Sequence, residues 1–165
     1  MKKIFFSGAV LIYCLLIAVS SHAQTIDVPA DVQKTFDEHF KNASVARWVP
    51  IQDSYVATFT QGQGYRDAYI TTEGEFKGVG RYISIDLLPI TAQEKIKNNY
   101  GNFELAQLYQ FDAVDNGISF YAVMNNAKNE LVLKMDGTGD VSFSKRNKIK
   151  AGAKMSEPLA SNTKH

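Results

Sequence analysis

Hydrophobic residues recur at four-residue steps in two stretches of the chain, and a hydrophobic residue followed by proline opens each stretch. Steps of four place the residues on one stripe of a helix, which is typical of a helix that covers a core. The two stretches are equivalent at an offset of 60 positions, through the pairs Val28/Leu88, Pro29/Pro89, Val32/Ala92, Phe36/Ile96 and Phe40/Tyr100.

Proline suits the first turn of a helix, where its missing N–H is not needed, so both helices are expected to begin just after it. In the second stretch Thr91 and Glu94 could instead form a capping box and move the start by two residues. Asn42 and Gly101 are expected to end the two helices.

Segments typical of strands follow each helix, separated by short turns rich in Gly, Asn and Asp. We expect strands at Val45–Val49, Tyr55–Thr60, Ala68–Thr72, Phe76–Ile85, Phe103–Phe111, Ile118–Met124, Leu131–Met135 and Val141–Phe143. Short connections imply antiparallel hairpins. The sequence therefore predicts an α+β fold, a tandem repeat (24–86 and 87–143) of one helix plus four antiparallel strands. One sheet would carry both helices on one face.

Alternation along the strands assigns side chains to the two faces of this sheet. The strongest apolar series should face the helices: Tyr55, Ala57, Phe59, Phe120, Ala122, Met124, Leu131 and Leu133. The opposite face would then carry Thr58 and the predicted partner-binding residues Val56, Tyr69, Tyr82, Tyr121 and Val123. Tyrosines with little charge suit recognition, although a solvated face on which tyrosine only satisfies strand propensity is the alternative. A register slip of one residue would exchange the faces.

The N-terminus has the three parts of a secretory signal peptide, which we predict to span residues 1–23. Lys2 and Lys3 precede an apolar run, and Ser21-His22-Ala23 places small residues at a cleavage site. A retained membrane anchor is the alternative, but the run is short for a bilayer span. We expect a periplasmic or secreted protein that begins at Gln24 and has no transmembrane segment after cleavage.

Composition excludes several classes of function but does not identify one. Net charge is +1 over 165 residues, which gives no field for nucleic acid, and the single cysteine, Cys14, excludes an intramolecular disulfide and a thiolate metal site. Residues 24–143 hold 10 Lys+Arg and 16 Asp+Glu, a net of −6, whereas residues 144–165 hold 6 and 1, a net of +5. We expect residues 144–165 to form a basic, disordered tail, serving either solubility or contact with anionic lipid or polysaccharide.

The order of these features resembles a known family. A helix ending in Phe40-Lys41-Asn42-Ala43 leads to a strand with Trp48, then to Tyr55-x-Ala57-x-Phe59 and the turn Glu73-Gly74. This resembles the PepSY-like domains of bacterial envelope proteins, which share the β-lactamase-inhibitor-like fold. The resemblance covers residues 26–143 and implies a small secreted module. It implies no functional residue, because the matching positions are packing and turn residues.

The search for reactive groups predicts no catalytic, cofactor-binding or metal site. His39 lies beside the apolar stripe and is expected to be a helix-edge residue over the core. Asp136-Gly137-Thr138-Gly139-Asp140 is a hairpin turn rather than a calcium loop, because it lacks the further oxygen ligands of an EF-hand. Gly62-x-Gly64 and Gly78-x-Gly80 lack the following helix of a phosphate loop.

We therefore expect a non-enzymatic envelope module that binds a protein or peptide, with an inhibitor-like role as one form of that activity. The alternative is a surface-associated structural protein, held to anionic lipid or polysaccharide by its basic C-terminal tail.

Overall fold

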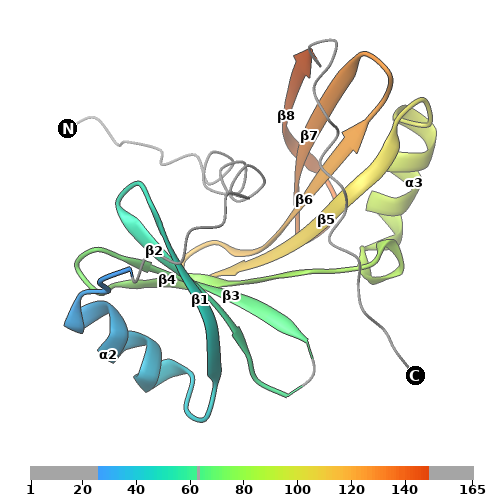
Figure 1. The fold of residues 1–165 in the computed structure, drawn as a ribbon. Coiled ribbons are helices and arrows are strands. Elements are labelled where there is room, and N and C mark those ends of the chain that lie inside the picture. The colour runs from blue at the N-terminus through green and yellow to red at the C-terminus, as the bar shows by residue number, and fades with distance from the viewer. Residues whose placement is uncertain (1–25, 63, 149–165) are drawn as a thin grey trace, which may run out of the picture. The chain divides into compact units, whose positions relative to one another are not determined.

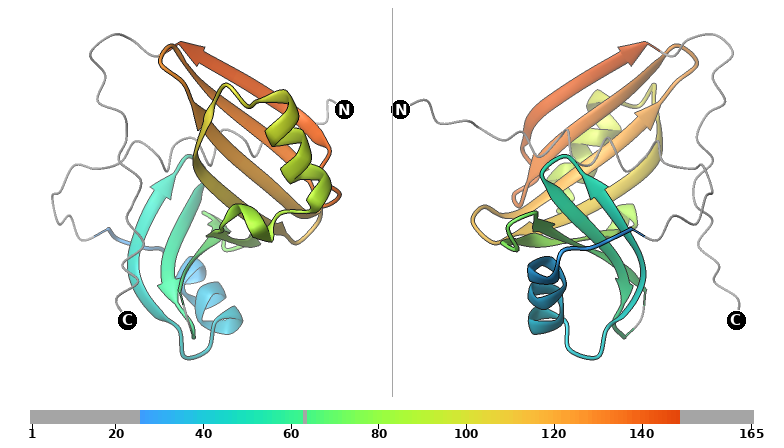
Figure 2. Two further views of the ribbon diagram at one scale, coloured as in Figure 1. Left: turned by 90° about the vertical axis from the view of Figure 1, so that its right-hand side faces the viewer. Right: turned by 60° about the vertical axis from the view of Figure 1, so that its left-hand side comes forward.

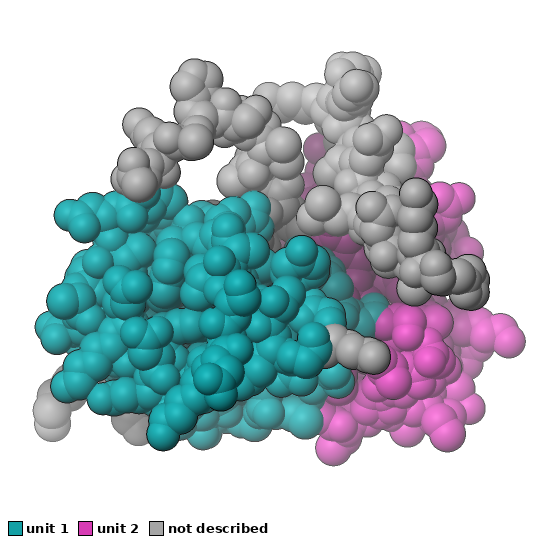
Figure 3. All heavy atoms as spheres, turned by 60° about the horizontal axis from the view of Figure 1, so that its bottom comes forward, with its two compact units in different colours: residues 1–83, 109–119 teal, residues 84–108, 120–165 magenta. Residues whose placement is uncertain are grey.

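The computed structural model describes residues 26–62 and 64–148, which form two compact units (Figure 3). Unit 1 contains the described residues up to Ile83 together with Tyr109–Ser119, and unit 2 contains Ser84–Leu108 and the described residues from Phe120 onward. The predicted signal peptide and residues 149–165 of the predicted tail lie outside the described residues. No helix of the described part has the length and hydropathy to cross a membrane.

The described chain forms two ten-residue helices, each followed by four strands (Figure 1). The order is α2 (Ala30–His39), β1 (Ser44–Ile51), β2 (Ser54–Thr60), β3 (Tyr65–Thr71), β4 (Phe76–Tyr82), the 3-10 turn η1 (Ile85–Leu87), α3 (Ile90–Asn99), β5 (Glu104–Ala113), β6 (Gly117–Asn125), β7 (Asn129–Asp136) and β8 (Val141–Lys148). The strands are hydrogen-bonded in chain order in one sheet. The predicted α+β class with an antiparallel sheet is confirmed.

Both helices start directly after proline. Pro29 and Pro89 are the N-cap residues, and their carbonyls accept the backbone N–H of Gln33 and Gln93. The alternative start at a Thr91 capping box is wrong, because the Thr91 hydroxyl donates to the carbonyl of Thr138 instead. The first helix ends at His39, earlier than the predicted Asn42, whereas the second ends at Asn99 with Tyr100 as its C-cap, so that Gly101 directly follows the cap as predicted.

Two strand boundaries differ from the sequence prediction. Strand β4 ends at Tyr82, and Ile85 belongs to η1 instead. Strand β8 continues to Lys148, so the predicted start of a disordered tail at Ser144 is wrong for Ser144–Lys148. The reason is that β7 begins at Asn129 and offers a backbone partner along its whole length, with Lys145 opposite Val132 and Lys148 opposite Asn129. Backbone pairing of this kind needs no apolar side chain.

The core of unit 1 lies between α2 and one face of its strands (Figure 1). Val32 and Phe36 of α2 are buried against a cluster of strand residues, Ala57, Phe59, Ala68 and Ile70. The Phe36 ring meets those of Phe59 and Trp48 edge-on, with centroids 5.2 and 5.4 Å away. Trp48 therefore belongs to the core, as its sequence position predicts.

A hydrogen bond joins α2 to the turn between β3 and β4. The Thr35 hydroxyl donates to the carbonyl of Gly74 at 2.6 Å. Gly74 has a φ of +84°, and a Cβ at this position would lie 3.1 Å from the carbonyl oxygen of Asp31. The helix and the turn thus approach so closely that only glycine fits the turn without strain.

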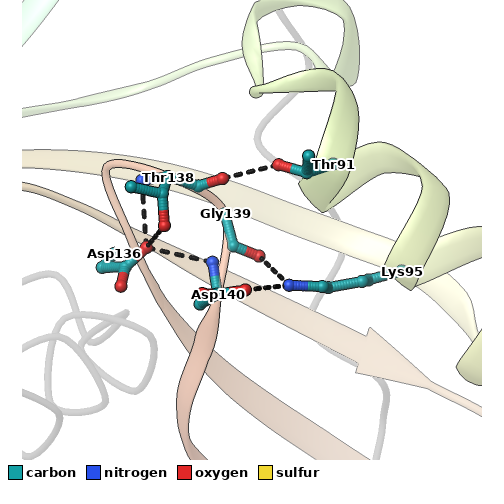
Figure 4. Close-up of polar contacts among 6 residues, drawn as sticks. All are labelled: Thr91, Lys95, Asp136, Thr138, Gly139 and Asp140. Atoms are coloured by element: carbon teal, nitrogen blue, oxygen red, sulfur yellow. Dashed lines mark hydrogen bonds and ion pairs between the residues drawn. The ribbon is translucent and has the colours of Figure 1, made fainter.

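In unit 2, α3 lies across its strands and buries Ala92 and Ile96 (Figure 2). The helix also contacts the turn between β7 and β8 (Figure 4). Lys95 forms an ion pair with Asp140, and its ammonium also donates to the carbonyl of Gly139 at 3.4 Å. Gly139 has a φ of +89°, and a Cβ there would lie 2.7 Å from the Thr91 hydroxyl. A glycine in a turn therefore sits under the helix in each unit.

Candidate functional site

The sheet of unit 1 has a second face, turned away from α2, which we call the distal face. The strand register assigns to it alternate residues of β1–β5: Arg47, Val49, Val56, Thr58, Thr60, Tyr65, Asp67, Tyr69, Gly78, Gly80, Tyr82, Tyr109, Phe111 and Ala113. The prediction that Tyr55, Ala57 and Phe59 of β2 face the helix is confirmed. Ala57 and Phe59 belong to the core beneath α2, and Tyr55 packs against this core.

The five predicted partner-binding residues do not form one exposed surface, and this prediction is corrected. Tyr82 is 48% exposed, but Val56 and Tyr69 on the same face are 0% and 3% exposed. Tyr121 and Val123 belong to unit 2 and are also buried. Tyr69 is buried because the Phe111 ring packs edge-on against it, with centroids 5.1 Å apart. The Lys134 ammonium lies 5.6 Å from the Tyr121 ring centroid.

A hydrogen-bonded network forms the base of the distal face. Both carboxylate oxygens of Asp67, a buried residue, accept hydrogen bonds, one from the Thr58 hydroxyl at 2.7 Å and the other from the Tyr109 hydroxyl at 2.9 Å. The hydroxyls of Tyr69 and Tyr109 are 3.0 Å apart. Because Tyr109 gives its single proton to Asp67, Tyr69 is the donor in this pair. The network fixes four side chains from three strands.

Burial raises the pKa of Tyr109 above its usual range, and neighbouring Tyr69 and Asp67 raise it further. The phenol therefore stays protonated and remains a donor to the carboxylate at all physiological pH values. A carboxylate whose two oxygens both accept such bonds acts as a structural anchor, since buried charges are stabilised by pairing and hydrogen bonding.

Gly80 makes this network possible. Gly80 lies between Asp67 on β3 and Phe111 on β5 in the register, and a Cβ there would overlap the Tyr109 ring and hydroxyl. A Cβ on Gly78, which has a φ of +152°, would overlap the carbonyl oxygen of Asp112 and the Phe111 ring. The Gly78-x-Gly80 pair therefore serves close packing of aromatic rings over β4.

Three exposed side chains lie at one end of this base, and we call Arg47, Tyr65 and Tyr82 the Arg–Tyr rim. Tyr65 and Tyr82 are 67% and 48% exposed, and Arg47 is exposed on the edge strand β1. Arg47 pairs with Thr58, which pairs with Asp67. Tyr65 lies two residues before Asp67 on β3, and Tyr82 lies two residues after Gly80, the antiparallel partner of Asp67 on β4. The register therefore brings the rim residues to the same end of the distal face.

Tyr82 is held over the buried base. Its ring meets the Tyr109 ring edge-on at a centroid distance of 5.0 Å. Burial is the main cause that raises the pKa of Tyr82. The Asp67 charge raises this pKa further, and the Arg47 charge lowers it. The rim thus has one aromatic anchor already fixed by packing, which reduces the entropy lost when a partner binds.

The other candidate groups have structural roles. Nδ1 of His39 donates to the Thr35 carbonyl at 2.9 Å, and the exposed His39 ring lies 4.4 Å from the Phe76 centroid, so the predicted helix-edge position is confirmed. In the turn of Figure 4, Asp136 Oδ1 accepts from the Thr138 backbone, the Thr138 hydroxyl and the Asp140 backbone at 2.9, 2.6 and 3.0 Å. These hydrogen bonds lower the pKa of Asp136, and the bond from the Thr138 hydroxyl has the largest effect. The hairpin-turn prediction is confirmed.

No group of three acidic, histidine or cysteine side chains that could hold a metal ion occurs in residues 26–62 and 64–148.

Sequence analysis missed Arg47, Tyr65, Asp67 and Tyr109. One signal was available, because Asp67 is a charged residue directly before the apolar run Ala68-Tyr69-Ile70 of the same strand. A second was the pair of glycines within β4, since glycine inside a strand often marks a close approach of another group. Neither signal identifies Tyr109 as the partner, because that requires the register of β4 and β5.

Comparison with known proteins identifies the fold. No protein-family model and no curated protein matches this sequence. Several solved structures are similar, among them the following three. A DUF2874 family protein from Bacteroides uniformis covers 72% of this chain and 88% of its own, with a TM-score of 0.66 and 14% identity. A "putative periplasmic protein" from Bacteroides eggerthii covers 73% and 90%, with a TM-score of 0.67 and 12% identity.

A BLIP-like protein from Bacteroides fragilis covers 82% of this chain and 96% of its own, with a TM-score of 0.63 and 13% identity. At these identities the likeness concerns the fold alone. The chain has the BLIP-like fold, an antiparallel sheet with two helices.

Proposed function

We propose that this chain is a non-enzymatic envelope module that binds a protein or peptide through the Arg–Tyr rim. The observation that carries the proposal is the exposure of Arg47, Tyr65 and Tyr82 above a base that is already fixed by hydrogen bonds. Tyrosine and arginine dominate the binding energy of protein interfaces, especially over a rigid support. The buried polar groups beneath them are committed to one another, which favours recognition over catalysis.

A periplasmic or secreted location is part of this proposal. The sequence of residues 1–23 has the three parts of a signal peptide. A solved structure of similar fold is described as a "putative periplasmic protein", which supports the same location here. An inhibitor-like role is one form of the proposed activity, and the BLIP-like fold is consistent with it.

We also propose that the two halves are a tandem repeat of the PepSY-like type. The helices begin and end 60 positions apart, at 30 and 90 and at 39 and 99. The turn glycines that meet them, Gly74 and Gly139, are 65 positions apart. Equivalent positions in helix and turn therefore make equivalent contacts, which is expected if one unit was duplicated.

Capture from an envelope extract tests the proposal. The purified protein and the variant Tyr65→Ser/Tyr82→Ser would be used as bait, and captured proteins would be quantified by mass spectrometry. The matched control is Ile90→Ser, which removes another exposed hydrophobic side chain, 73% exposed, from unit 2. We expect the double variant alone to lose the partner while it stays folded. Equal capture by all three baits would contradict the proposed site.

One observation favours the second candidate, a structural protein held to anionic material by its basic end. Lys145, Arg146 and Lys148 are exposed on the edge strand β8, immediately before residues 149–165. Deletion of residues 149–165 leaves β8 intact and is the appropriate variant. Loss of envelope association on this deletion, with unchanged partner capture, would favour the second candidate.

A further inference from the structure

The distal face presents a positive charge to solvent. Of its residues only Arg47 and Asp67 are charged. Asp67 is 6% exposed, and both its oxygens accept hydrogen bonds from Thr58 and Tyr109. The exposed charge of the face is therefore that of Arg47 alone.

The donors of the Arg–Tyr rim have no acceptor of their own within the described part of the chain. The Arg47 guanidinium takes part in no ion pair or hydrogen bond there, and neither do the hydroxyls of Tyr65 and Tyr82. Asp67 forms no ion pair with Arg47, and it is buried with its oxygens accepting from Thr58 and Tyr109. A planar guanidinium on the same face as two phenols is suited to a carboxylate, which accepts two parallel bonds from arginine.

We propose that the Arg–Tyr rim recognises an acidic side chain on a peptide segment of the partner, with Arg47 holding the carboxylate and Tyr65 and Tyr82 packing against the flanking residues. This inference rests on the proposed function, because it concerns the same surface. A lipid surface is the less suitable partner, since lipid recognition typically uses clusters of about four to eight basic residues and this face offers one.

Peptide binding tests the inference with defined probes. The purified protein would be titrated into labelled peptides of one aromatic-containing sequence in which glutamate, glutamine or lysine occupies the same positions. We expect the glutamate peptide to bind about tenfold more tightly than the glutamine peptide, the scale of one hydrogen bond to a charged group. The lysine peptide should bind least, and added salt should weaken the preference.

Two arginine variants locate the effect. Arg47→Gln should remove the preference for glutamate, and Arg47→Lys should retain part of it, because lysine keeps the charge but not the planar fork. The matched control is Arg81→Gln, which makes the same charge change at an exposed residue adjacent to Tyr82 that lies on the opposite face by register. Equal effects of Arg47→Gln and Arg81→Gln would overturn the assignment, as would equal or undetectable binding of the glutamate and glutamine peptides.

The outcomes also separate this inference from the proposed function. If Tyr65→Ser/Tyr82→Ser loses the native partner but the protein shows no preference for glutamate peptides, the Arg–Tyr rim remains the proposed binding surface. The inference that it recognises an acidic side chain is then overturned. Binding to phosphatidylglycerol vesicles that depends on Arg47, without a preference for glutamate peptides, would overturn the peptide and indicate a lipid.

Discussion

The Tyr109 hydroxyl donates to the Asp67 carboxylate at 2.9 Å although β4 lies between their strands. The side chain crosses β4 at Gly80, where no Cβ obstructs it. A tyrosine on β5 is therefore tied to an aspartate on β3, and the glycine between them is as necessary as either partner. The distal face owes its fixed shape to this crossing.

Replacing the glycine should disrupt the crossing. We expect Gly80→Ala to lower the free energy of unfolding by about 3 kcal/mol or more, the upper part of the range for overpacking. Urea unfolding followed by circular dichroism measures it. In Gly80→Ala/Tyr109→Ser the obstructing ring is absent, so the double variant should lose less than the sum of the two single losses. Strict additivity would contradict the described contact.

Thr58 should stabilise the fold through its hydroxyl. Thr58→Val keeps the shape but removes one donor from buried Asp67, which we expect to cost about 1–3 kcal/mol of unfolding free energy. The control is Thr60→Val, two residues further on the same strand and face, at a half-buried position. That change should stay within about 0.5 kcal/mol. Similar losses at both positions, measured by urea unfolding, would argue against the network.

Alanine substitutions of three glycines with positive φ distinguish backbone strain from steric overlap of the added Cβ. Gly62, Gly74 and Gly139 have φ values of +75°, +84° and +89°, but a Cβ on Gly62 would meet nothing within 4 Å. Gly62→Ala should therefore cost only the strain of about 1–2 kcal/mol. Gly74→Ala and Gly139→Ala should cost more, with Gly139→Ala the largest, because each Cβ also meets a helix. Equal melting temperatures for the three variants would contradict helix–turn contact in both units.

Alkaline pH should destabilise the protein through its buried tyrosines. Burial raises the pKa of Tyr121 to about 12 and also raises that of Tyr109, whereas an unfolded chain releases these protons near pH 10. Above about pH 10 the unfolded state therefore binds fewer protons than the folded state, and stability falls as pH rises. Tyr121→Phe should make this fall shallower in urea unfolding repeated across that range. An unchanged slope would contradict the burial of Tyr121.

The sequence predicts the helices of this fold better than its candidate site. The stripes Val32/Phe36 and Ala92/Ile96 are local patterns, and the structure buries all four residues. Alternation also assigns Ala57 and Phe59 to the correct side of the sheet. Period two says which residues share a face but not whether that face is covered, so Tyr69 was expected to be exposed.

The network of Asp67 depends on information that no short segment contains. Its donors come from β2 and β5, 9 and 42 positions away in the chain, and only the register of successive strand pairs aligns them. The end of β8 was missed for a similar reason. Its basic composition suggests a tail, but β7 supplies backbone partners as far as Lys148.

Site-specific photo-crosslinking tests the central claim, that the Arg–Tyr rim contacts the partner. Benzoylphenylalanine would replace Tyr65 or Tyr82, and in controls Ile90 or Val114, which are 73% and 62% exposed and are not distal-face residues. After irradiation of envelope extracts, adducts would be detected by immunoblotting and mass spectrometry. We predict one common adduct from positions 65 and 82 and none from positions 90 and 114. Adducts from positions 90 or 114 but not from 65 and 82 would contradict the account.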